Sequence, residues 1–227
     1  MSIRNVYLDC EFLAADPSLR GLVSIGLTDD HGVDFYAVHQ DFDVAALLDS
    51  EWMVDNVWPS LPTVHAPGAL QALNLLHEDV LTADEIRTGV ADYFADTDAT
   101  ETHLYAYYGG QDICRLHSLW DNNWAVMPDE IPRWFNELEM LRVQAGGPDM
   151  PEQESGLHNA LEDARHNRRM HRFLREQQQE MAQLVRDLTI PEPCRLDEGC
   201  QEHFWFTDDR PCPHGRAHAL FPDTKEQ

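Results

Sequence analysis

Apolar and polar residues alternate along three stretches near the start of the chain, residues 5–12, 22–28 and 33–39. This period of two is typical of half-buried β-strands. The turn signal Asp29-Asp30-His31-Gly32 separates the last two stretches, so we expect at least these two to form a hairpin.

Apolar residues at helical spacing follow. Asp43 predicts the N-cap of a helix that runs through Val57 and ends before Pro59. Residues 62–81 have weak periodicity and are expected to form a loop with one short helix at most. Residues 82–85 match a capping box ahead of a second amphipathic helix, with its apolar positions at Ile86, Val90, Tyr93 and Phe94.

The second half of the chain repeats the change between strand and helix. We expect a strand at 103–108, a helix at 112–123, an ordered segment that opens at Pro132, and a helix from about Ala160 to Leu188. A polar, Pro/Gly-rich loop over residues 146–156 leads to that last helix. Three sequential strands followed by helix, strand, helix, strand predict an α/β fold, a mixed sheet flanked by helices.

Composition sets the class of protein. The 227 residues suit one domain, residues 1–190, followed by an acidic tail, residues 191–227. The sequence contains no run of about eighteen apolar residues, so no membrane-spanning helix is expected. A strand begins so near the start of the sequence that no signal peptide is expected. Five cysteines without a tight framework fit a reducing compartment, so a cytoplasmic protein is expected. Cys10 and Cys114 are interpreted as small core residues.

The formal net charge of −25 limits the possible nucleic-acid partners. Proteins that hold long duplexes through the phosphate backbone carry a basic surface. Exposed charges are screened beyond roughly 8 Å at physiological salt, so local charge decides more than the total. The charge argues against wide, non-specific duplex binding and remains compatible with a pocket that grips a few terminal nucleotides.

Two acids lie on the first strand. Asp9 and Glu11 are two residues apart, so their side chains project to the same face, roughly 7 Å apart along the strand. Two carboxylates at one place suit Mg²⁺ or Mn²⁺. A solvated strand face can also carry two acids, so the pair alone is a weak signal.

Three further residues complete the pattern. Asp112 heads a predicted helix after the glycine turn at residues 109–110, where the helix dipole also favours an acid. Asn159 is expected to cap the last helix, with Glu162 in the capping-box position. Asp163 then lies in the first turns of that helix and His158 in the loop before it, where the imidazole can reach an attacking water.

These segments resemble the DEDDh group of 3′→5′ exonucleases, in which D-x-E, a central Asp and H-x4-D occur in this order. Four stretches resemble the ribonuclease AS branch, which acts on adenylate-rich RNA: residues 8–12, 22–26, 132–135 and 158–165. The resemblance covers about residues 4–174. The chain departs from it in a longer segment between Pro62 and Thr102 and in the tail, which puts substrate length and base preference in question.

The resemblance implies a ribonuclease H-like fold, a homodimer and single-stranded RNA 3′ ends as substrate. Two metal ions, Mg²⁺ or Mn²⁺, would be held by Asp9 as the bridging ligand, by Glu11 and Asp163, and by Asp112 directly or through water. His158 is assigned as the general base, because an imidazole can accept a proton near neutral pH.

Candidates for contact with the terminal nucleotide are Phe12, Ser24, Ile25 and Gly26. An aromatic ring after the metal-binding strand could stack a base, and Gly26 could let a nucleotide approach the backbone. Sheet core is the alternative interpretation for Phe12, and it is the favoured one for Ile25. The helical stripe Arg165, Arg168, Arg172 and Arg175 points away from the metals at 3.6 residues per turn. Salt bridges or a subunit interface are therefore expected for it.

The tail contains ligands that Zn²⁺ could use: Cys194, Cys200, His203, Cys212, His214 and His218. Their spacings match no standard zinc finger, so a solvated tail is expected and a small zinc clip is the alternative.

The leading hypothesis is a metal-dependent 3′→5′ exoribonuclease that releases nucleoside 5′-monophosphates. A single-stranded DNA exonuclease shares the same metal motif and stays open. A non-catalytic acidic adaptor that binds partners through its tail is the alternative from another class, and the complete set of five site residues argues against it.

Overall fold

The computed structural model describes residues 2–64 and 72–187. The chain divides into two compact units, Met1–Phe173 and Leu174–Gln227, with the border inside the last helix. The expected domain end at residue 190 and the whole 191–227 tail, with its zinc-capable Cys and His residues, lie outside the described residues.

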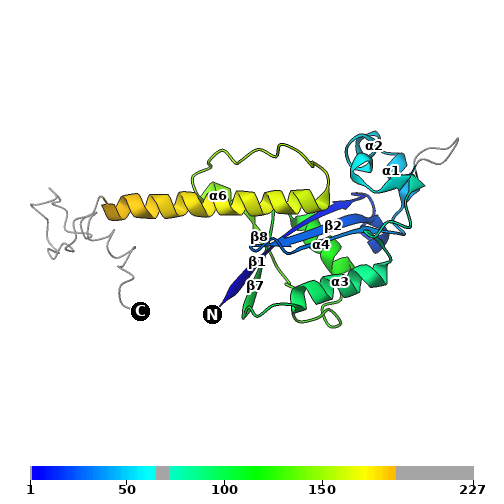
Figure 1. Ribbon diagram of the computed structural model, residues 1–227, viewed down its shortest axis with the longest axis horizontal. Helices are drawn as coiled ribbons and strands as arrows, with labels where there is room; N and C mark the ends of the chain where they lie inside the picture. The colour runs from blue at the N-terminus through cyan, green and yellow to red at the C-terminus, as the bar shows by residue number, and fades with distance from the viewer. Residues whose placement is uncertain (1, 65–71, 188–227) are drawn as a thin grey trace, which may run out of the picture. The chain divides into compact units, whose positions relative to one another are not determined.

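The first unit is built on a six-stranded mixed sheet with the order β6-β3-β2-β1-β7-β8 (Figure 1). Antiparallel pairs join β1 to β2 and β2 to β3, and parallel pairs join β3 to β6, β1 to β7 and β7 to β8. The strands are β1 (Ile3–Phe12), β2 (Leu22–Asp29), β3 (Asp34–His39), β6 (Val80–Leu81), β7 (Glu101–Ala106) and β8 (Asn136–Glu137).

Helices cover both faces of this sheet. On one face, α3 (Ala83–Ala95) and α4 (Gly110–Ser118) pack on the alternate β1 residues Val6, Leu8 and Cys10. On the other face, Tyr7 of β1 packs with α5 (Leu138–Gln144) and with Met170 of α6 (Ala160–Asp187). Figure 1 shows α3 and the first part of α6 on opposite sides of the strands. The predicted ribonuclease H-like α/β fold is thereby confirmed.

The predicted helix over residues 43–57 is wrong in one respect, because two short helices occupy it. Asp43 caps α1 (Val44–Leu48) by accepting a hydrogen bond from the Ala46 amide. Ser50 then caps α2 (Glu51–Asn56) by accepting one from the Met53 amide. Serine competes for backbone donors and so favours a new helix start over a helix interior. A 3₁₀ turn, η2 (Trp58–Ser60), follows α2.

The segment 62–81 also differs from the predicted loop with a short helix. Its described residues contain a two-stranded pair, β4 (Thr63–Val64) with β5 (Ala72–Leu73), and β6 as an edge strand of the main sheet. These strands are two residues long, too short for a hydrophobic period to be visible in the sequence.

Most other predictions hold within a few residues. The capping box at Thr82 and Glu85 is present, while the predicted 103–108 strand and 112–123 helix lie at β7 and α4. The first regular element after Pro132 begins only at β8. A 3₁₀ turn, η1 (Leu19–Gly21), precedes β2.

The two cysteines in the described residues differ in environment. Cys10 is buried in the core, as expected, whereas Cys114 is exposed, so its assignment to the core was wrong. The buried α4 residues Asp112, Arg115 and Leu116 recur at a spacing of three to four and mark the inward face, and Cys114 lies on the other side of the helix.

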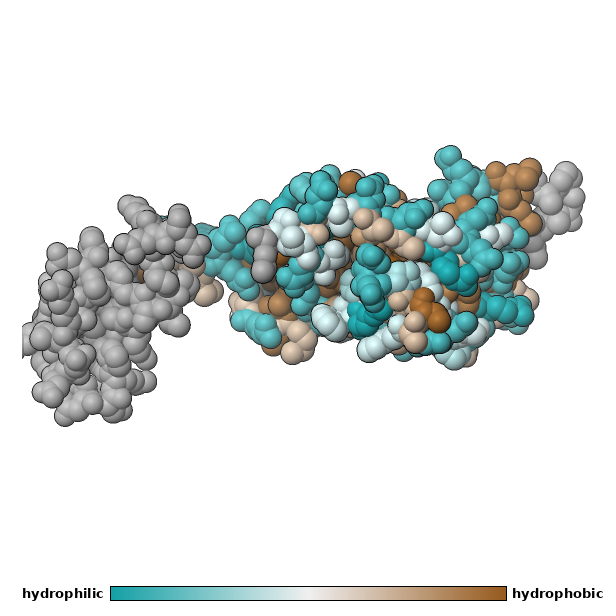
Figure 2. All heavy atoms as spheres, turned by 90° about the horizontal axis from the view of Figure 1, so that it is seen from below, coloured by the Kyte–Doolittle hydropathy of each residue, from teal (hydrophilic) through white to brown (hydrophobic). Residues whose placement is uncertain are grey.

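Figure 2 shows one face on which hydrophilic side chains predominate and hydrophobic ones are scattered between them. None of the helices in the described residues combines the length and the hydropathy that crossing a bilayer requires.

Candidate active site

Asp9 and Glu11 lie near the end of the central strand β1. They stand opposite Gly26 and Ser24 of β2, and the strand register shifts between Glu11 and Phe12. Such an irregularity bends a strand and is common beside functional sites. Asp9 is half-buried and Glu11 is buried. Both side chains project from the face of the sheet that α6 covers, so the position of α6 determines which residues lie beside them.

Helix α6 is brought close to β1 by two residues. A Cβ at Gly26 would lie 2.3 Å from the carbonyl carbon and oxygen of Ala160, the first residue of α6, so only glycine fits there. The side-chain amide of Asn167 donates a hydrogen bond to the Leu8 carbonyl of β1 at 3.0 Å. The helix start therefore rests on the sheet beside Asp9 and directs Asp163 toward the strand acids.

A hydrogen bond joins the main chain of His158 to the side chain of Asp163. The His158 N–H donates to Asp163 Oδ2 at 3.0 Å, and the Gln153 side chain donates to Asp163 Oδ1 at 2.6 Å. Asn159 caps the helix as predicted, accepting from the Leu161 and Glu162 amides. The expected Glu162 half of the capping box is absent from the hydrogen bonds of the described residues, where Glu162 pairs instead with Arg165.

One ligand atom each from Glu11, His158 and Asp163 lies within 4.8 Å of the other two. Carboxylate oxygens with one imidazole nitrogen suit Mg²⁺, Mn²⁺ or another divalent ion of the first transition row. This donor chemistry fits the expected metal. The 4.8 Å grouping also means that His158 is close enough either to bind a metal ion or to act as a base.

The pKa values of the site acids are raised, because burial and neighbouring carboxylates disfavour their ionised forms. Burial, followed by the charges of Asp163 and Asp112, raises the pKa of Glu11 to about 8. Burial also raises the pKa of Asp9, to which Asp112, Asp163 and Glu11 add. The pKa of Asp163 is raised by burial, although its hydrogen bonds from Gln153 and His158 act against the rise. The four carboxyl groups are thus near enough to repel one another when ionised.

Asp112 reaches the site from α4. It is the third residue of that helix, it is buried, and its Oδ1 accepts a hydrogen bond from the Cys10 amide at 3.0 Å. Cys10 stands between Asp9 and Glu11 on β1, so this bond fixes Asp112 next to both. Burial raises the pKa of Asp112 to about 7, although the Cys10 hydrogen bond opposes that rise.

These pKa shifts predict how stability depends on pH. A carboxyl whose pKa is higher in the folded state stabilises the fold at low pH, and this contribution is lost as pH rises from about 4 through 7. Asp112→Asn keeps the acceptor for the Cys10 amide and removes the charge. At pH 8 without metal, we expect the variant to be at least ~1 kcal/mol more stable than the parent protein, about 2–4 °C in melting temperature.

The measurement is a set of melting curves at pH 4 and pH 8, with EDTA and with Mg²⁺. The difference between variant and parent should shrink toward pH 4, where both side chains are neutral. Added Mg²⁺ should stabilise the parent more than the variant. A variant that melts below the parent at pH 8 in EDTA would contradict the electrostatic account.

The four predicted substrate contacts lie in packed surroundings: Phe12, Ser24, Ile25 and Gly26. Ser24 and Ile25 are buried, Ile25 within the core cluster, so neither presents a surface to a nucleotide. The close approach that Gly26 permits is that of Ala160, which occupies the space assigned to a nucleotide. Phe12 is partly buried, and the Arg115 guanidinium lies over its ring, 4.9 Å from the centroid. One face of Phe12 is therefore covered, which favours the sheet-core interpretation.

Arg115 is a structural residue that the sequence did not single out. It is almost fully buried on α4, and its guanidinium donates to the carbonyls of Leu13, Asp16 and Ser18. It ties together the loop between β1 and β2. A lone Arg among polar helix residues carries no signal of this role.

Gln153 and Asn167 also escaped the sequence interpretation. Asn167 follows Asp163 by four residues, so the helical period alone places both on one face. That spacing could have identified it. Gln153 lies in a loop without periodicity, and its contact with Asp163 depends on how the loop folds back.

In the described contacts, the arginines of the α6 stripe bind other groups of this protein. Arg165 pairs with Asp34 and Glu162. Arg168 donates to the Asp29 carbonyl at 2.9 Å. These contacts agree with the expectation of salt bridges rather than an RNA track. His117 and His171 are both buried, so of the two expected uses, surface or packing, packing is correct.

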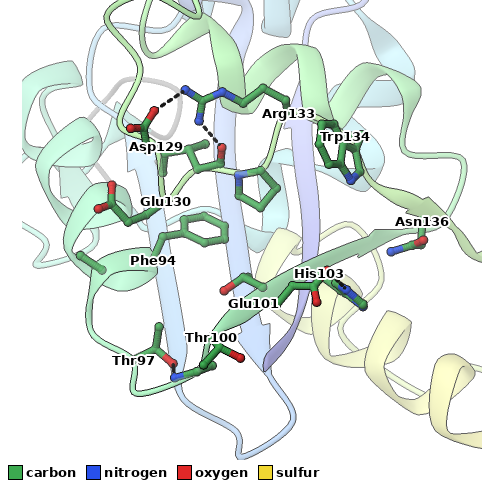
Figure 3. Close-up of a pocket in the computed structure, with 15 residues that line it drawn as sticks. Phe94, Thr97, Thr100, Glu101, His103, Asp129, Glu130, Arg133, Trp134 and Asn136 are labelled. Carbon is green, nitrogen blue, oxygen red and sulfur yellow. Dashed lines mark hydrogen bonds and ion pairs between the residues drawn. The ribbon is translucent and has the colours of Figure 1, made fainter. Parts of the chain in front are cut away.

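A cavity of ≈ 800 Å³ lies away from this site. It is lined at the start of β7 by Glu101 and His103, and Trp134 stands at it (Figure 3). The Arg133 guanidinium is held by the Asp129 carboxylate and by the Ile131 carbonyl. The site acids Asp9, Glu11, Asp112 and Asp163 are not among the lining residues.

Comparisons with known proteins find sequence relatives that cover most of the chain. No protein-family model matches the chain. A protein named 3′-5′ exoribonuclease from two strains of Mycobacterium tuberculosis is 29% identical over 168 residues, which are 74% of this chain and 91% of the relative. A structure of product-bound exonuclease I has 13% identity and a TM-score of 0.49, covering 82% of this chain and 46% of that one. The sequence similarity to the exoribonuclease thus spans nearly the whole relative.

Proposed function

We propose that this chain is a metal-dependent 3′→5′ exoribonuclease that hydrolyses single-stranded, adenylate-rich RNA to nucleoside 5′-monophosphates. The observation that carries the proposal is the convergence of Glu11, His158 and Asp163 within 4.8 Å. Asp9 and Asp112 interact electrostatically with the same group. The relatives named 3′-5′ exoribonuclease support the reaction class.

The residues divide the work of phosphodiester hydrolysis. Divalent ions held by the four acids would supply positive charge to the phosphoryl oxygens and help to activate the attacking water. These ions would be held at one place by the carboxylates of Asp9, Glu11, Asp112 and Asp163, whose ionised forms a nearby cation would favour. His158 accepts the proton of the attacking water. The hydrogen bond from the His158 N–H to the Asp163 carboxylate holds the base beside the acids.

The acidic composition selects the form of the substrate. With a net charge of −25 and site acids at the end of β1, the chain has little with which to grip a long duplex. A single-stranded end can reach the acids with few phosphate contacts. The adenylate preference, the homodimer and the cytoplasmic location follow from the resemblance and from composition, and they remain predictions.

The test uses 5′-end-labelled homopolymers of the four RNA bases, matched single-stranded DNA, and an RNA duplex in one buffer with Mg²⁺ or Mn²⁺. We expect oligo(A) RNA to be shortened stepwise from its 3′ end with AMP as product, and the duplex to be degraded at least tenfold more slowly. EDTA should stop the reaction.

The other outcomes select between the alternatives. Equal rates on all four RNA homopolymers would remove the adenylate preference and keep the exoribonuclease. DNA degraded as fast as RNA would favour the DNA exonuclease. No product from any substrate, from folded protein with metal present, would favour the non-catalytic adaptor.

A further inference from the structure

The ring of Trp52 lies against the imidazole of His158. The two ring centroids are 4.9 Å apart and the planes are at 76°, an edge-to-face contact. Trp52 belongs to α2, more than a hundred residues before His158, and 54% of its surface is exposed. A large apolar ring that stays at the surface beside the proposed base calls for an explanation beyond core packing.

The helix that carries Trp52 is firmly anchored. Its neighbours Met53 and Val57 are buried in a core cluster together with Val23 of β2 and Val38 of β3. Packing of this face fixes the position of α2 on the sheet. The Trp52 ring is therefore presented from a rigid support.

The segment after α2 also holds the backbone of His158. The Ser60 hydroxyl lies 2.6 Å from the His158 carbonyl oxygen and 2.8 Å from that of Val57. A hydroxyl has one proton, so it donates to one of these carbonyls at a time, and the His158 contact is the shorter. On the other side, the His158 N–H donates to Asp163.

His158 has a backbone φ of 60°, in the left-handed region that non-glycine residues rarely adopt. Such a conformation persists where the surroundings impose it. Trp52 and Ser60, both from residues 51–60, contact the side chain and the carbonyl of the strained residue. Asp163, a proposed metal ligand, contacts its amide.

We propose that Trp52 and Ser60 are positioning residues that hold the imidazole of His158 in the orientation from which it accepts the proton of the attacking water. The proposal rests on the exonuclease function above. Trp52 limits the rotation of the ring through the edge contact, and Ser60 fixes the main chain that carries it. Direct stacking of an RNA base on the exposed Trp52 surface is the competing use of this residue.

The two uses differ in the kinetic constant that changes. A positioning residue acts on the chemical step, so Trp52→Ala should lower kcat by roughly three- to tenfold, as an aromatic contact of this kind warrants. KM should change less than twofold. Trp52→Phe keeps an aromatic ring and should restore kcat to within about twofold of the parent. A base-stacking residue would instead raise KM.

The decisive measurement is a double-mutant cycle on oligo(A) RNA with His158→Ala. If Trp52 acts through the imidazole, Trp52→Ala should cost nothing more once that imidazole is gone. Ser60→Ala should show the same pattern, and it provides a second route if Trp52→Ala fails to fold. Trp134→Ala is the matched control, since it removes another exposed tryptophan, at the cavity of Figure 3.

Several results would overturn the proposal. Additive losses in the Trp52→Ala/His158→Ala protein, a rise in KM with unchanged kcat, or an equal loss in Trp134→Ala would each do so. Failure of the underlying function has a different appearance, because His158→Ala would then be as active as the parent protein, or the parent would degrade no RNA.

Discussion

Asp9→Asn should lower kcat by at least roughly a hundredfold while the protein stays folded. A divalent ion contributes several kcal/mol to stabilising a phosphoryl transition state, and about 1.4 kcal/mol corresponds to a factor of ten in rate. Asp9 interacts with all three other site acids, as the causes of its raised pKa show. Removal of its charge therefore weakens the hold on any ion the group shares.

The measurement combines single-turnover RNA cleavage with Mn²⁺ titration by calorimetry, and thermal melting in EDTA verifies the fold. Asp55→Asn is the matched control, because Asp55 is an exposed acid on α2 outside the site. Its activity should equal that of the parent. Full activity of Asp9→Asn, in protein purified free of other nucleases, is the outcome that would exclude the metal assignment.

The site acids could be predicted because their signals are local. Asp9 and Glu11 share a strand face through a period of two, and the six residues from His158 to Asp163 cross a helix start. The structure brings Glu11, His158 and Asp163 together in agreement with that spacing. The order of strands and helices could also be predicted, since the hydrophobic periodicity of long amphipathic elements indicates which face is buried.

The residues that support the site could not be predicted, because their roles depend on contacts between distant segments. Trp52 and Ser60 meet His158 across about a hundred residues of chain. For Gly26, the sequence shows that a glycine leaves space for a close approach and does not show what fills it. Helix α6 fills it. Short strands such as β5 and β6 fall below the length at which periodicity can be measured.

The position of His158 raises the question of whether it is a base or a metal ligand. Its ring nitrogen can stand within 4.8 Å of the ligand atoms of Glu11 and Asp163. The Trp52 and Ser60 contacts orient the ring and its main chain, as contacts around either a base or a metal-binding histidine can. We assign His158 as the base, and its effect on metal affinity separates the two roles.

His158→Ala should therefore lower kcat by about 10²–10⁴-fold, the contribution typical of general acid–base catalysis, and leave Mn²⁺ affinity within about threefold of the parent. Asp163→Ala should lose both activity and affinity, since Asp163 is assigned as a ligand. His31→Ala, at an exposed histidine in the turn between β2 and β3, should change neither. Cleavage rates at saturating metal and calorimetric titration of metal-free protein measure the two effects separately. If His158→Ala loses as much Mn²⁺ affinity as Asp163→Ala and recovers activity at high Mn²⁺, the imidazole is a ligand, and the proton of the attacking water must pass to another group.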